Sequence, residues 1–86
     1  MPIRVRLFGE FREAAGREVE VEAGMIRELL EKLSENPRLR NALFENWEER
    51  RLKKYVNILV NGRRVEEDEA LKEGDTVAIF SPVAGG

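Results

Sequence analysis

The chain has 86 residues, of which 37% are charged, and its formal net charge is −2 at neutral pH. It contains neither cysteine nor histidine, which excludes disulfides, thiolate nucleophiles, and the commonest general base and metal ligand. The balanced charge gives no attraction to nucleic acid. No segment is apolar enough to span a membrane or to act as a signal peptide, so we expect a cytoplasmic protein. The length predicts a single domain.

The first third of the chain predicts two strands. Residues 3–8 (IRVRLF) alternate strictly, with Phe8 on the face opposite the aliphatic residues, as is typical of a half-buried strand. Residues 17–24 (REVEVEAG) alternate again. The connection between them, residues 9–16, is bounded by glycines and has room for one helical turn. Two such runs indicate a hairpin.

The hydrophobic period changes after residue 24. Residues 25–36 (MIRELLEKLSEN) carry one apolar stripe of an amphipathic helix, formed by Ile26, Leu29, Leu30 and Leu33. Asn36 and Pro37 end this helix and can serve as the cap and first residue of another. Residues 38–54 have apolar residues at roughly helical spacing, including Trp47, and predict a helix or an ordered loop.

The last third of the chain predicts further strands. Residues 55–65 (YVNILVNGRRV) contain Asn61-Gly62, a strong signal for a tight turn between two strands. Residues 66–75 form a charged connection in which Leu71 is expected to point inward. Residues 76–80 (TVAIF) are the last strand, in which Val77 and Ile79 face opposite to Ala78 and Phe80.

This order predicts an α+β protein with the β-grasp (ubiquitin-like) architecture. We expect a mixed sheet of four to five strands, one main helix packed across one face, and the first and last strands side by side at the centre. The domain is expected to cover residues 1–80, and residues 81–86 are expected to form a flexible tail ending in Gly-Gly.

No motif predicts a catalytic or metal site in this chain. The carboxylates lie in helix faces and charged turns, which is typical of a solvated surface, and no glycine-rich phosphate loop follows a strand. The basic pairs Lys53-Lys54 and Arg63-Arg64 have no interleaved aromatic residues and are interpreted as surface. The chain is therefore not expected to be an enzyme on its own.

The tail has the composition of a segment that is inserted into a partner. Pro82 stiffens its exit from the sheet, and the six residues 81–86 can reach roughly 20 Å at ~3.3 Å per residue. Gly85 and Gly86 have no Cβ, so they fit a narrow tunnel and expose the terminal carboxylate. The alternative is that a terminal Gly-Gly is a disordered end or a cloning scar.

An apolar patch is predicted beside this tail. If the main helix covers the aliphatic face of the sheet, then Phe8 and Phe80 lie on the open face, and Leu59 joins them by its strand phase. Contiguous exposed apolar groups usually mark interaction sites, so the patch is interpreted as a docking surface. The alternative is that a second helix or a loop covers these residues.

Both ends of the sequence resemble a known family. The stretch VAIFSPVAGG resembles the C-terminus of the molybdopterin synthase small subunit, the MoaD-type ubiquitin-like sulfur carrier, which typically ends in Phe-x-Pro-Val-x-Gly-Gly. The opening VRLFGEFREAAG, with Phe8 and Arg12-Glu13, resembles that family's first strand and following loop, and LKEGDTVAIF resembles its last turn and strand.

The resemblance implies a mechanism in which Gly86 is the reacting residue. An adenylating partner enzyme uses ATP to convert its carboxylate to an acyl-adenylate, and a sulfur donor then leaves a thiocarboxylate. The tail residues Ser81, Pro82, Val83, Ala84 and Gly85 enter the large synthase subunit, which holds the catalytic side chains. Sulfur is transferred there to a pterin precursor, giving the molybdopterin that carries molybdenum or tungsten. The chain itself is implied to bind no cofactor.

Three other functions remain open. A ubiquitin-like modifier would use the same acyl-adenylate to join Gly86 to lysines of other proteins. A related thiazole-synthesis carrier is a second alternative, against which the stretch Ser81-Pro82-Val83 favours the pterin branch. The third is a plain β-grasp binding module in which the tail is incidental.

Overall fold

The computed structural model describes residues 2–82 of the chain. The elements in this range are, in chain order, β1 (Pro2–Leu7), α1 (Gly9–Ala15), β2 (Glu18–Glu22), α2 (Ile26–Leu33), α3 (Pro37–Leu43), β3 (Phe44–Asn46), β4 (Arg51–Leu52), β5 (Asn57–Val60), β6 (Arg63–Arg64) and β7 (Thr76–Phe80). No helix within this range is both long and apolar enough to cross a bilayer.

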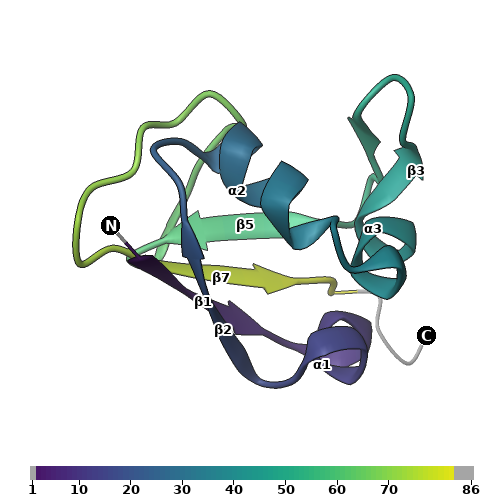
Figure 1. Cartoon of the computed structure of the whole chain (residues 1–86), viewed down its shortest axis with the longest axis horizontal. Helices are drawn as coiled ribbons and strands as arrows, with labels where there is room; N and C mark the ends of the chain where they lie inside the picture. The colour runs from purple at the N-terminus through teal and green to yellow at the C-terminus, as the bar shows by residue number, and fades with distance from the viewer. Residues whose placement is uncertain (1, 83–86) are drawn as a thin grey trace.

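The main sheet has the predicted β-grasp topology. Within the described range it contains five strands in the order β2-β1-β7-β5-β6. The first and last strands, β1 and β7, pair in parallel at its centre, and the other neighbours are antiparallel. Helix α2 crosses one face of this sheet, and α1 and α3 lie at one end of it (Figure 1). The predicted mixed sheet with a main helix on one face is confirmed.

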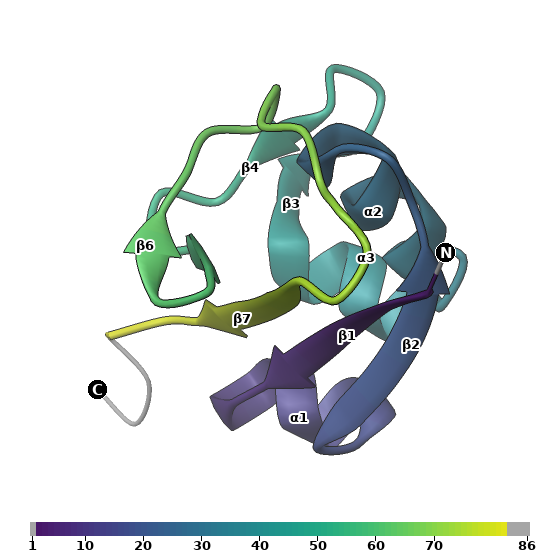
Figure 2. The same ribbon diagram turned by 90° about the vertical axis from the view of Figure 1, so that its left-hand side faces the viewer.

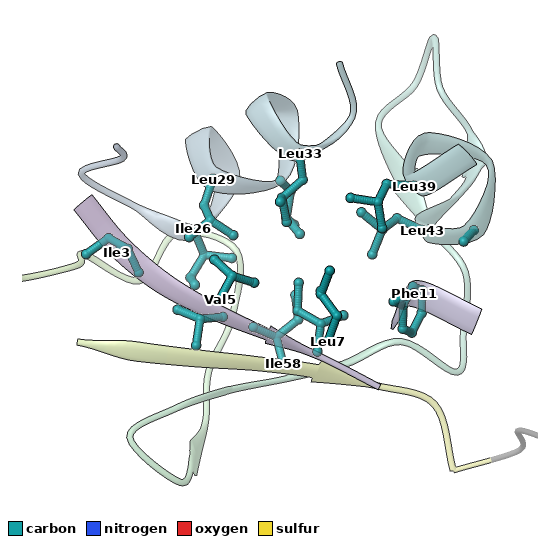
Figure 3. Close-up of a cluster of buried hydrophobic side chains, with 14 of the residues drawn as sticks. Ile3, Val5, Leu7, Phe11, Ile26, Leu29, Leu33, Leu39, Leu43 and Ile58 are labelled. Atoms are coloured by element: carbon teal, nitrogen blue, oxygen red, sulfur yellow. The ribbon is translucent and has the colours of Figure 1, made fainter. Parts of the chain in front are cut away.

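The core lies between α2 and the sheet. In β1 every second residue, Ile3, Val5 and Leu7, is buried, and the alternate residues are exposed. The predicted stripe of α2 meets them, because its four apolar residues are at most 5% exposed. Figure 3 shows these side chains meeting between the helix and the strands, with Phe11 of α1 and Leu39 and Leu43 of α3 closing one end. Each fully buried side chain of this kind contributes roughly 1.5–3 kcal/mol.

Helix α3 begins where the sequence predicts a helix start. The side-chain oxygen of Asn36 accepts hydrogen bonds from the backbone N–H groups of Arg38 (2.9 Å) and Leu39 (3.3 Å), and Pro37 is the first helical residue. An N-cap of this kind satisfies donors that the helix itself leaves unpaired. The predicted turn in the 9–16 connection is a seven-residue helix, α1, because Phe11 anchors it in the core.

The prediction of a helix or an ordered loop over residues 38–54 is wrong in its second half. Helix α3 ends at Leu43, and β3 and β4 form an antiparallel hairpin on the helix side of the sheet (Figure 2). The Trp47 ring meets the Phe44 ring edge-on, with the centroids 5.0 Å apart. The guanidinium of Arg50, a residue with φ of 55°, lies over the indole ring, 3.6 Å from its centre. Trp47 thus anchors a hairpin loop instead of continuing a helical stripe.

Hydrogen bonds among Asn61, Lys72, Asp75 and Thr76, here called the polar clasp, join the predicted tight turn to the start of β7. Asn61 adopts a φ of 51°, and its side chain accepts a hydrogen bond from Thr76 N–H (3.1 Å) and donates one to Asp75 (2.9 Å). The other Asp75 oxygen accepts from Lys72 N–H at 2.8 Å. The Lys72 N–H, with a smaller effect of the Asn61 amide, holds the pKa of the Asp75 carboxyl below its ordinary value.

We expect Asp75→Asn to lower the free energy of unfolding at neutral pH, because the charge-assisted hydrogen bonds become neutral ones. A carboxyl whose folded pKa is lowered stabilises fully above the ordinary aspartate value of about 3.9, and this stabilisation is lost as the pH falls through the folded pKa. The difference between the wild type and the variant should therefore shrink on acidification below about pH 4. Urea unfolding along a pH series measures it.

Asp68→Asn is the matched control, since Asp68 is exposed and forms no side-chain hydrogen bond or ion pair within residues 2–82. Its difference from the wild type should stay small throughout the series. A stability difference for Asp75→Asn that does not change with pH contradicts the prediction.

Candidate functional site

The face of the main sheet opposite α2 carries the apolar residues that the sequence singles out. Along β7 the buried residues Val77 and Ile79 alternate with the half-buried Ala78 and Phe80. Leu59 of β5 is also half-buried, and it lies directly beside Ala78 in the antiparallel register. The strand phase predicted for these residues is therefore confirmed, although Phe80 and Leu59 are less exposed than a free surface position would be.

Phe8 is the exposed member of this group, with 41% of its surface accessible. It lies one residue beyond β1, where it is the extended N-cap of α1, so the predicted strand over residues 3–8 is one residue too long. Gly9, with φ of 58°, turns the chain away immediately after it. The Arg6 guanidinium lies 5.7 Å from the centre of the Phe8 ring, on the same side of the sheet.

The backbone brings Phe8 to the end of β7. Its N–H donates a hydrogen bond to the carbonyl of Ile79 at 3.3 Å, and β1 and β7 are paired in parallel with Leu7 beside Ile79. Phe8 directly follows Leu7, and Phe80 directly follows Ile79. The docking patch, defined as Phe8, Leu59 and Phe80, thus lies where the last strand ends and the tail begins. Helix α2 crosses the other face and α3 lies at one end of the sheet (Figure 1), so the alternative of a covering second helix is not supported.

The start of the tail leaves the sheet next to this patch. Ser81 is half-buried and Pro82 is exposed. The predicted tail residues Val83, Ala84, Gly85 and Gly86 lie outside the described residues. Their predicted roles therefore rest on the sequence.

Three arginines surround Phe8, of which Arg12 was named above only for the family resemblance and Arg6 and Arg17 were not predicted as site residues. Arg6, Arg12 and Arg17 line one groove with Leu7, Phe8 and Glu18. One signal for Arg6 was available, because strand alternation places it on the same face as Phe8. Arg12 is also one helical turn beyond Phe8. The approach of Arg17 depends on tertiary pairing.

The chemistry available at this end of the molecule is recognition. Residues 2–82 contain no group of three or more carboxylates placed to hold a metal ion. The lowered pKa of Asp75 belongs to the clasp at the start of β7, at the strand end opposite the patch. An apolar patch with arginines at its border can bind a protein surface.

Known proteins are similar to this chain in fold and in sequence. The ThiS family model matches residues 5–86. Small archaeal modifier protein 3 of Haloferax volcanii is 36% identical over 95 residues, covering 100% of both chains. The crystal structure of SAMP1 from Haloferax volcanii has a TM-score of 0.88 and 30% identity, with 100% of both chains covered. The putative molybdopterin converting factor subunit 1 from Pyrococcus furiosus has a TM-score of 0.76 and 36% identity, covering 96% of this chain and 99% of that one.

Proposed function

The chain belongs to the ThiS family of ubiquitin-like carriers and modifiers, whose members are not catalytic on their own, and from this membership we propose that it is the sulfur-carrying small subunit of a molybdopterin synthase. The observation that carries the proposal is the exposed Phe8 beside the end of β7, at the root of a tail with the sequence SPVAGG. Likeness to a putative molybdopterin converting factor subunit 1 supports the pterin branch.

In this proposal the reacting group is the carboxylate of Gly86. One of its oxygens attacks the α-phosphorus of ATP in an adenylating partner enzyme, pyrophosphate leaves, and an acyl-adenylate forms. A sulfur nucleophile then displaces AMP and leaves a thiocarboxylate. The docking patch, Phe8, Leu59 and Phe80, binds the partner, while Ser81, Pro82, Val83, Ala84 and Gly85 place the terminus in the partner's active site. The partner therefore supplies the ATP site, and the large synthase subunit supplies the pterin site.

Protein modification is the second candidate function, and the likeness to small archaeal modifier proteins favours it specifically. The acyl-adenylate of Gly86 would then be attacked by a lysine amine of another protein, with loss of AMP and formation of an isopeptide bond. Both functions share the docking patch and the activated terminus. They differ only in the nucleophile that accepts the acyl group.

Intact-mass spectrometry separates the two functions. The chain is incubated with an adenylating enzyme from its own source, ATP and sulfide, and we expect a mass increase equal to the replacement of one oxygen by sulfur. The charged chain, mixed with the large subunit and the pterin precursor, should return to its original mass as molybdopterin forms. Without ATP no mass change is expected. If sulfur is never gained and a tagged chain instead forms ladders with other proteins, the modifier function replaces the carrier function.

A further inference from the structure

A cationic groove lies immediately beside the docking patch. It is lined by Arg6, Arg12 and Arg17, together with Leu7, Phe8 and Glu18. These arginines come from three different segments: β1, α1 and the turn before β2. The groove is therefore a product of the fold and not of one basic run in the sequence.

The backbone fixes the origin of each arginine. Arg6 is on the outer face of β1, two residues before Phe8. The backbone N–H of Arg12 lies 3.4 Å from the Phe8 carbonyl oxygen, which places Arg12 one turn above the aromatic residue. The Arg17 carbonyl accepts a hydrogen bond from the Leu7 N–H at 2.9 Å, so Arg17 lies across from the end of β1.

Two of the three arginines of this groove have no charged partner among the described residues. Arg12 and Arg17 are exposed and form no side-chain ion pair or hydrogen bond within residues 2–82. The one carboxylate that lines the groove, Glu18, is paired with Arg4 at 3.2 Å. Three guanidinium groups therefore face solvent here in a chain whose net charge is −2. Guanidinium groups pair with carboxylates and phosphates through two parallel hydrogen bonds.

We propose that the groove formed by Arg6, Arg12 and Arg17 binds carboxylate side chains of the protein that docks on Phe8, and that it steers this protein to the patch. The proposal rests on the proposed function and names the chemistry of the partner surface. The ligand is a protein carboxylate and not the phosphate of ATP, because the groove is at the root of the tail. An extended segment of six residues, the length of the tail, can span up to roughly 20 Å, so the reacting terminus can act far from the groove.

Charge reversal tests the steering. The double variant Arg12→Glu/Arg17→Glu is compared with Arg27→Glu/Arg38→Glu, which makes the same charge change at exposed residues of α2 and α3. Association rates with the adenylating enzyme are measured at low and high salt. We expect the groove variant to associate at least about tenfold more slowly at low salt and to lose most of its salt dependence. The control variant should change the rate far less. Equal effects of the two variants overturn the proposal.

A second measurement uses the chain alone, so that failure of the carrier function is distinguishable from failure of this inference. Arginine Nε–H resonances are followed by NMR during titration with a hexaglutamate peptide and, separately, with inorganic pyrophosphate. The resonances of Arg6, Arg12 and Arg17 should shift at lower peptide concentration than those of Arg27 and Arg38. Uniform shifts, or a clear preference of the groove for pyrophosphate, contradict a carboxylate site whether or not the chain accepts sulfur.

Discussion

A chain extended by one alanine after Gly86 is expected to gain no sulfur, although it folds and binds its partner. The added residue moves the terminal carboxylate by about 3.3–3.6 Å and introduces a Cβ where the proposed tunnel accommodates none. A displacement of about 1 Å at a reacting centre can already cost roughly a hundredfold in rate. Deletion of Gly86 should have the same effect, because the carboxylate then falls short of the reacting centre. Intact mass after the ATP-dependent reaction measures both variants against the wild type.

The control for the tail variants is partner binding. Phe8 and Phe80 are unchanged in both variants, so the affinity for the adenylating enzyme should stay close to that of the wild type. The melting temperature should also be unchanged, because the described core ends at Ile79 in β7. Sulfur gain by either variant at the rate of the wild type contradicts the assignment of Gly86 as the reacting residue. Loss of binding in both variants would instead indicate that the tail itself contributes to docking.

The sheet and the main helix could be predicted because their patterns depend on local geometry alone. A strand that is buried on one side must alternate, and Ile3, Val5 and Leu7 do so. The stripe of α2 follows from the 3.6-residue period in the same way. These two periods, together with the Asn61-Gly62 turn, are sufficient to give the order of α2 and the strands of the main sheet along the chain.

The β3–β4 hairpin could not be predicted because its contacts are not periodic. It depends on the edge-to-face pair of Phe44 and Trp47, on the Arg50 guanidinium over the indole, and on a positive φ at Arg50. Arginine is not a residue that signals such a conformation. The spacing of Trp47 from Leu43 fits a helix equally well, so the sequence pattern favoured the wrong element.

The sequence predicts on which face of the sheet the patch residues lie. It does not predict how exposed these residues are or that arginines gather beside them. Alternation assigned Phe80 and Leu59 to the open face, yet both side chains are half-buried in the structure. The cationic groove requires Arg17 to lie opposite Leu7, a pairing between β1 and the turn before β2. Such convergence is a property of the tertiary structure. The carrier chemistry of Gly86 has a different basis, since it rests on the family resemblance and on the tail sequence.

Phe8→Ala is expected to weaken partner binding by roughly 1–4 kcal/mol, or about fivefold to a thousandfold in Kd, the range for an aromatic anchor that becomes buried in an interface. The side chain is 41% exposed in the free chain and lies outside the buried core, so its loss should change the melting temperature little. Phe80→Ala should weaken binding in the same direction but also lower the melting temperature, because Phe80 is half-buried. Calorimetric titration with the adenylating enzyme and thermal unfolding measure both quantities.

Phe8→Leu is the matched variant for this prediction. It keeps most of the apolar surface that docking would bury and removes the ring that Arg6 covers at 5.7 Å. Its affinity should fall between those of the wild type and Phe8→Ala, since leucine retains most but not all of the apolar area that docking would bury. If Phe8→Ala binds as tightly as the wild type, the partner does not dock on this patch. The tail would then have to supply the binding energy alone, and the affinity would fall when residues 81–86 are removed.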